Sequence, residues 1–293
     1  MSRPRLNGPL SLTVVIWGYN FVSLKLLYRE MPAGVVAVVR FLLMWGTLWL
    51  LCLATRRLPK IEKGDRLRIL GSGFLSMGLY MSLFLSGMAG TTPAEGAIML
   101  ATAPVLTYLI SLMLKWERYL PVALAGTLMA FGGVAIIVGA AHSGHGSLRG
   151  NGLVFASAIV WAVSALAMRP LVGKYDPLAV LTYSMPGALP ALLMYGGAAT
   201  LAYDPSHLTY VGVLNLGQAV FFSGVLAFLS FYKGLSQVGP AMATAYQFCV
   251  PVIATFFGWV FFRHTLVPLQ WIGVMAVLSG VGTASWARAR AAR

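Results

Sequence analysis

Three charged side chains stand within long apolar runs of this sequence, where charge is rare. Glu95 is the carboxylate inside such a run, and Lys25 and Arg40 lie in the first two runs of the chain. A charge at the centre of a membrane helix costs roughly 2.5–3.5 kcal/mol on insertion scales, so such groups usually pair or face water. We expect Glu95 to pair with Lys25 or Arg40. This pair would position helices; alternatively, Glu95 would hold an ammonium group or a proton, or simply face the outer membrane interface.

Aromatic and polar side chains at helical spacing form a second candidate set. Glu95 and Met99 are four residues apart and share a helical face, and Tyr246 with Gln247 occupies a similar apolar run near the C-terminus. The remaining members of this set are Trp17, Asn20, Tyr80, Trp161 and Ser164. Aromatic walls with few polar groups suit an amphipathic solute. The alternative for each ring is helix packing, or, for the tryptophans, anchoring at the membrane interface.

Two prolines, Pro104 and Pro251, fall in the middle of apolar runs. A proline inside a helix removes one backbone hydrogen bond and kinks the helix. We predict a bend at each position that gates a cavity, with ordinary packing geometry as the alternative.

Enzymatic chemistry finds little support in the sequence. No two carboxylates share an apolar run, so general acid–base catalysis lacks its pair of groups. His142 and His145 lie in a Gly/Ser loop without a nearby Cys, Asp or Glu, which does not suit a metal site. We therefore expect no catalytic residue, no metal and no cofactor.

The elements that carry these residues follow from composition. Of the 293 residues, 59% are hydrophobic and 10% are charged, whereas soluble domains are about 45–50% apolar and about 25% charged. A membrane helix needs roughly 20 mostly apolar residues, and ten such runs occupy nearly the whole chain. They cover about residues 10–28, 34–54, 69–88, 93–114, 120–139, 152–172, 178–201, 211–235, 241–262 and 269–286.

The distribution of basic residues predicts the orientation of these ten helices. With both termini in the cytoplasm, sixteen of the 21 Lys and Arg residues lie in cytoplasmic segments, counting Arg169 and Lys233 at the cytoplasmic ends of their runs. Three lie in outer loops, and Lys25 and Arg40 lie elsewhere within runs. This asymmetry is what the positive-inside rule requires. Because the basic residues punctuate apolar runs and form no stripe, the net charge of +14 does not indicate nucleic-acid binding. We expect a multi-pass protein of a cell inner membrane, with the lipid bilayer as its surroundings.

The second half of the sequence repeats features of the first. Three residues of the first half recur 147 positions later: Pro93 as Pro240, Pro104 as Pro251, and Gly126 as Gly273. Trp17 and Lys25 recur 144 positions later as Trp161 and Arg169. We predict two five-helix repeats, residues 1–145 and 146–293. Since five is odd, the two repeats must have opposite orientations, which is typical of transporters.

The repeat also predicts which helices surround a cavity. Those from the first, third, fourth, sixth, eighth and ninth runs carry the aromatic and polar residues and would form its walls. The second and seventh runs are almost entirely apolar, apart from Arg40, and are expected outside it. The fifth and tenth runs are rich in small residues suited to helix packing.

Several short motifs make the sequence similar to a known family. Residues 17–21 (WGYNF) followed by Lys25, residues 40–41 (RF), 103–104 (AP) and 117–118 (ER) resemble the landmarks of EamA-domain proteins in the drug/metabolite transporter superfamily. The likeness covers the whole chain and is greatest to amino-acid exporters of the YddG type. The sequence departs from the family pattern at two positions. In the second copy His264 stands at the position that corresponds to Glu117, and in the first copy Glu95 is a carboxylate although its counterpart in the second copy is Met242.

This resemblance implies an all-α membrane transporter that exports amino acids, aromatic ones included, and related amphipathic metabolites by alternating access. A single carboxylate within the runs favours facilitated movement over a proton-driven cycle. A multidrug or cation–proton antiporter of the same superfamily and a non-transporting membrane scaffold or sensor are the alternatives. The sequence leaves the oligomeric state open, a homodimer included.

Overall fold

The chain folds into a bundle of helices, seen in a computed structural model that describes residues 6–56, 60–88, 90, 99–139, 147–262 and 267–291. No strand occurs among these residues. The helices of the first half are α1 (Gly8–Leu27), α2 (Ala33–Ala54), α3 (Lys63–Gly73), η1 (Phe74–Leu79), α4 (Tyr80–Met88), α6 (Thr102–Met113) and α7 (Pro121–Gly139). Those of the second half are α8 (Leu148–Lys174), α9 (Pro177–Leu201), η2 (Pro205–His207), α10 (Tyr210–Gly217), η3 (Gln218–Leu226), α11 (Ala227–Val238), α12 (Pro240–Ala245), η4 (Tyr246–Phe248), α13 (Cys249–Phe262) and α14 (Pro268–Ala291).

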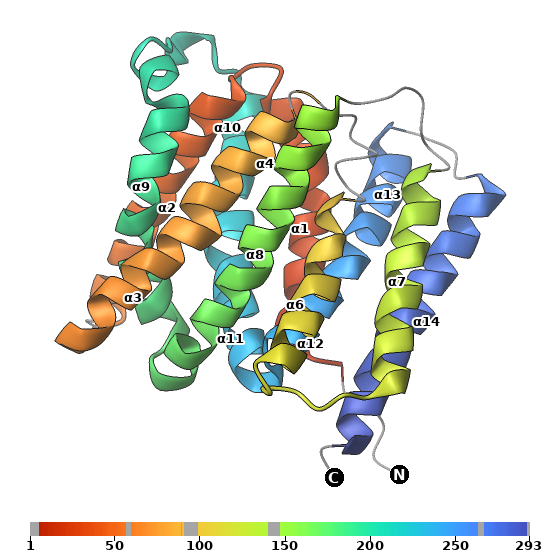
Figure 1. Ribbon diagram of the computed structural model, residues 1–293. Helices are drawn as coiled ribbons and strands as arrows, with labels where there is room; N and C mark the ends of the chain where they lie inside the picture. The colour runs from red at the N-terminus through yellow and green to blue at the C-terminus, as the bar shows by residue number, and fades with distance from the viewer. Residues whose placement is uncertain are drawn as a thin grey trace.

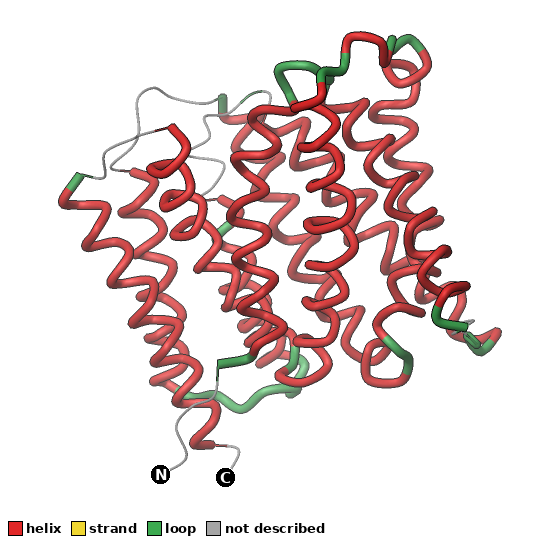
Figure 2. Tube along the Cα trace, turned by 180° about the vertical axis from the view of Figure 1, so that it is seen from behind, coloured by secondary structure: helices red, strands yellow, loops and turns green. Residues whose placement is uncertain are grey.

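The helices run side by side, and both chain ends lie at the same end of the bundle, which we call the termini side (Figures 1 and 2). Seven of the described helical segments are long and apolar enough to cross a membrane, and two shorter ones, Thr102–Met113 and Pro121–Ile137, are apolar as well. Each run predicted from the sequence contains helix, although the third segment begins at Lys63 and not at Ile69. The protein is therefore an all-helical membrane protein.

Local sequence explains where several helices begin. The side chain of Asn7 accepts a hydrogen bond from the backbone N–H of Leu10 at the start of α1, and Ser147 does the same for Gly150 at the start of α8. Such caps satisfy N–H groups that lack a partner in the first turn. Between α11 and α12 the chain turns at Gly239, whose φ of 78° favours glycine.

Helices α7 and α14 pack closely at one edge of the bundle (Figure 1). A Cβ atom added to Gly126 would lie 2.7 Å from the carbonyl oxygen of Gly280, and one added to Gly133 would lie 2.7 Å from that of Gly273. Small residues let membrane helices approach backbone to backbone. The glycines therefore set the separation between the fifth and last helical segments.

Two further contacts join helices from the two halves of the chain. Gly234 of α11 leaves room for Leu10 of α1, and Gly87 of α4 leaves room for Val154 of α8, because an added Cβ would lie 2.4 Å and 2.7 Å from those side chains. The two glycines, Gly87 and Gly234, are 147 positions apart, and the residues they meet, Leu10 and Val154, are 144 positions apart. The two contacts thus relate equivalent positions of the two halves.

Two long segments contain a wide, π-helical turn near their middle. Residues Lys63–Met88 pass through η1, and residues Tyr210–Val238 pass through η3. A π turn shifts the hydrogen-bonding partner from i+4 to i+5 and is frequent at functional sites. In this bundle both turns lie beside the central cavity, since Tyr80 directly follows η1 and Ser223 belongs to η3.

Candidate functional site

A cavity of about 200 Å³ lies within the bundle. Its walls come from α1, α2, α4, α6, α8, η3, α11, η4 and α13. Along α1 the lining residues extend from Trp17, half-way along the helix, to Tyr28, which follows its last turn. The cavity therefore reaches from the middle of the bundle toward the side opposite the termini.

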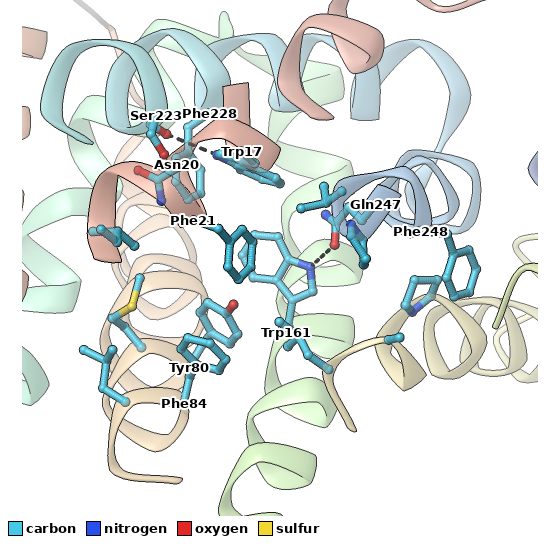
Figure 3. A pocket seen from close by; sticks show the side chains of 18 of the residues that line it. Trp17, Asn20, Phe21, Tyr80, Phe84, Trp161, Ser223, Phe228, Gln247 and Phe248 are labelled. Atoms are coloured by element: carbon cyan, nitrogen blue, oxygen red, sulfur yellow. Dashed lines mark hydrogen bonds between the residues drawn. The ribbon is translucent and has the colours of Figure 1, made fainter. Parts of the chain in front are cut away.

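Aromatic rings form the centre of the wall (Figure 3). The ring of Trp161 lies 4.9 Å from that of Tyr80, 6.1 Å from that of Trp17 and 5.7 Å from that of Phe231, between ring centroids. Trp17 in turn lies 5.2 Å from Phe228. All four distances fall in the range in which aromatic pairs add about 0.5–1.5 kcal/mol beyond their burial. The cluster joins α1, α4, α8 and α11 and gives the cavity a firm apolar surface.

Two hydrogen bonds fix the tryptophan rings. The indole N–H of Trp161 donates to the side-chain oxygen of Gln247 at 2.9 Å, and that of Trp17 donates to the backbone oxygen of Ser223 at 3.2 Å. The amide nitrogen of Gln247 and the amide oxygen of Asn20 are buried and have no hydrogen-bond partner within the described structure. A buried polar group without a partner costs free energy, so both amides are suited to bind a ligand.

Arg40 brings a positive charge to the same cavity. Arg40 is 7% exposed, and one terminal nitrogen of its guanidinium donates to the hydroxyl of Ser223 at 3.2 Å. Its Nε is buried without a partner among the described residues. The sequence places the second helix outside the cavity; this prediction is wrong for Arg40, because α2 packs beside η3 and directs this side chain inward.

Five of the predicted binding residues line the cavity, namely Trp17, Asn20, Tyr80, Trp161 and Gln247. Ser164 and Tyr246 are buried outside the lining: the Ser164 hydroxyl donates to the backbone oxygen of Trp161 at 2.8 Å, and the Tyr246 hydroxyl accepts from the backbone N–H of Asn7 at 3.0 Å. Met99 is half-buried and also lies outside the lining.

The predicted charge pair is only partly described. Glu95 lies outside the described residues, together with Pro93, His142, His145 and His264. Lys25 is exposed on α1, whereas Arg40 is buried. The pairing of Glu95 with either cation remains a prediction.

Pro104 and Pro251 both line the cavity. A proline leaves the carbonyl of the residue four positions earlier without its helical partner, and those residues, Leu100 and Gln247, line the cavity as well. The helix around Pro251 narrows to the 3₁₀ turn η4 just before α13. Pro251 thus lies just after a departure from regular α-helix geometry, and Pro104 lies in the first turn of α6. A bend that gates the cavity at these positions stays a prediction.

Side-chain contacts join the two halves of the chain at the termini side. The side-chain nitrogen of Asn7 donates to the Gln237 side chain at 2.8 Å. The Lys174 ammonium at the end of α8 donates to Glu62 at 2.6 Å and to Asp65 at 2.8 Å. These contacts bridge α1 to α11 and α8 to the start of α3, and thus connect the two halves on this side.

Sequence reasoning missed Phe228, Phe248 and Met81 as lining residues. The repeat itself carried a usable signal: Met81 and Phe228 are 147 positions apart, as are Ala101 and Phe248, and all four line the cavity.

A bundle of membrane-spanning helices around a mostly apolar cavity that extends toward one side defines a membrane transport protein. The model of the EamA-like transporter family matches the chain twice, over residues 10–139 and 148–286. The chain therefore belongs to the EamA-like transporter family.

The names of several relatives agree with this class. The chain is 26% identical to the uncharacterized transporter YetK of Bacillus subtilis (93% of this chain, 84% of the relative). It is 26% identical to a probable terminal-alkyne amino-acid exporter of Streptantibioticus cattleyicolor (93% and 90%) and 23% identical to a probable amino-acid metabolite efflux pump of Escherichia coli (94% and 94%). A solved crystal structure superposes with a TM-score of 0.80 over 98% of both chains at 18% identity, which shows a shared fold.

Proposed function

We propose that this transporter exports amino acids and related amphipathic metabolites by alternating access. The observation that carries the proposal is the aromatic cavity between the two halves of the chain, which extends toward one side, while side-chain contacts join the halves on the other. A solute bound at Trp17 and Trp161 would contact both halves at once, because α1 and α8 belong to different halves. Binding would then shift the population between outward- and inward-open states.

The proposed mechanism needs two inverted repeats, residues 1–145 and 146–293, with ten membrane-spanning helices in total. The paired contacts Gly87–Val154 and Gly234–Leu10 support this arrangement, since each contact recurs at equivalent positions with the halves exchanged. The double family match, once in each half, supports it as well. In such proteins one repeat rocks against the other around a central site.

We further propose that the protein lies in the inner membrane with both termini in the cytoplasm, as the basic residues favour. The termini side is then cytoplasmic, and the closed contacts of Lys174 with Glu62 and Asp65 lie there. The described conformation would be outward-facing. Export would follow when these contacts open and a cytoplasmic solute reaches the aromatic cluster.

Two observations favour amino acids and facilitated movement. The relatives from Streptantibioticus cattleyicolor and Escherichia coli carry names that refer to amino acids or their metabolites. The described cavity wall contains aromatic rings, two amides and one guanidinium but no carboxylate, so no described group in it would carry a proton through the cycle. Movement down the substrate gradient is the simplest mechanism that fits.

Counterflow in liposomes tests the proposal. Purified protein would be reconstituted with an unlabelled amino acid inside, and entry of the same labelled amino acid would be followed for each of the twenty, with and without a pH gradient. We expect counterflow of apolar and aromatic amino acids with little dependence on the gradient. Strong dependence on the pH gradient that is lost in Glu95→Gln would contradict facilitated movement. Counterflow of quaternary amines alone would indicate a multidrug antiporter. No counterflow of any solute would favour a scaffold or sensor.

A further inference from the structure

The cavity holds one buried positive charge without an opposing charge among its described lining residues. Among the described residues, the guanidinium of Arg40 donates to the neutral hydroxyl of Ser223, and its Nε has no hydrogen-bond partner. Burying an ion without a counter-charge is costly, whereas a guanidinium binds a carboxylate with two parallel, charge-assisted hydrogen bonds. Within the described part of the chain, the guanidinium therefore keeps a donor that suits an anionic group.

The equivalent position in the second half shows that packing does not require this arginine. With the offset of 144, Arg40 of α2 corresponds to Ser184 of α9, and with the offset of 147 its partner Ser223 corresponds to Ser76. Ser184 is fully buried, and α9 packs against η1 much as α2 packs against η3. Because a small hydroxyl side chain occupies the equivalent place, the packing of α2 against η3 does not by itself account for the charge of Arg40.

We propose that Arg40 binds the carboxylate of the transported solute, while the rings of Trp17, Tyr80 and Trp161 contact its side chain. This inference rests on the proposed transport function and narrows its substrate class to solutes with a carboxylate beside an apolar group. One terminal nitrogen of the guanidinium donates to the Ser223 hydroxyl, and the buried Nε is a donor without a partner among the described residues. The carboxylate of the solute would neutralise the buried guanidinium charge.

The test compares an acid with its neutral amide. Counterflow and binding would be measured for phenylalanine and phenylalaninamide, which share ring and ammonium group but differ in the carboxylate. In the wild type we expect a preference for phenylalanine. Arg40→Gln should reduce this preference about tenfold to a hundredfold, the equivalent of the 1.5–3 kcal/mol of a hydrogen bond to a charged group, and should leave phenylalaninamide bound. Ser184→Ala is the matched control and should keep the wild-type preference.

A second measurement needs no variant, so a folding defect of Arg40→Gln cannot obscure the result. Phenylacetate, which keeps the carboxylate, should inhibit phenylalanine counterflow in the wild type better than phenethylamine, which keeps the ammonium group. Equal preference in wild type and Arg40→Gln, or stronger inhibition by phenethylamine, would overturn the role of Arg40 while leaving transport intact. Equal loss in Glu95→Gln and Arg40→Gln of both acid and amide transport would instead assign Arg40 to a structural ion pair. A wild type that moves none of the twenty amino acids would refute the proposed function itself.

Discussion

A single methyl group added at Gly133 should force α7 and α14 apart. The new Cβ would lie 2.7 Å from the carbonyl oxygen of Gly273 and 2.7 Å from the backbone nitrogen of Val277. Ordinary contact begins near 3.4 Å, so each pair must separate by about 0.7 Å. Both opposing atoms are backbone and cannot rotate away, which means that one helix must shift as a whole. Overpacking of this kind costs about 1–3 kcal/mol.

The neighbouring glycine supplies a control on the same helix. Nothing lies within 4 Å of a Cβ added to Gly132, so Gly132→Ala should be neutral or stabilising by up to about 1 kcal/mol through its better helix propensity. We expect Gly133→Ala to unfold at a clearly lower temperature than Gly132→Ala when both are heated in detergent and followed by tryptophan fluorescence. Equal melting temperatures for the two variants would refute the close approach of α7 and α14.

Two further predictions concern the cavity and its closed side. Trp161→Phe keeps most of the ring packing but leaves the Gln247 oxygen without its donor at 2.9 Å. A buried acceptor without a partner costs about 1–3 kcal/mol of stability, so we expect the variant to unfold at a lower temperature than the wild type in detergent. An unchanged melting temperature would argue against this bond. Lys174→Met removes the hydrogen bonds to Glu62 and Asp65. We expect this variant to show faster hydrogen–deuterium exchange at the start of α3 and the end of α8. Exchange equal to that of the wild type would show that these contacts do not hold the termini side closed.

Much of the architecture could be predicted because membrane helices are specified by simple features. A run of about 20 apolar residues must satisfy its backbone hydrogen bonds internally, so it becomes a helix wherever it lies in the sequence. Chain length and the spacing of these runs then place helix in every predicted segment. The boundaries deviate at polar ends, as at Lys63, because a helix continues beyond the apolar run that identifies it.

Part of the cavity could also be predicted, and for a related reason. Trp17 and Trp161 stand out because aromatic residues next to polar ones recur at equivalent positions, and both line the cavity. Tyr246, whose equivalent in the first half is Met99, is predicted to line the cavity because it is aromatic and stands beside Gln247. It is buried outside the lining and accepts a hydrogen bond from the backbone N–H of Asn7. Aromatic type next to a polar residue therefore indicates a buried position, but not which part of the interior the side chain occupies.

The sequence by itself determined that the chain forms membrane helices and which residues are candidates for a site. The tertiary structure decided which way each helix turns its faces, because helices that are apolar all round carry no polar face to set their rotation. It also decided where π turns shift the register, as in η1 and η3, since the pattern of apolar residues does not distinguish an i+5 from an i+4 hydrogen bond. Arg40 is the clearest example: its charge is visible in the sequence, but only the packing of α2 beside η3 brings that charge into the cavity.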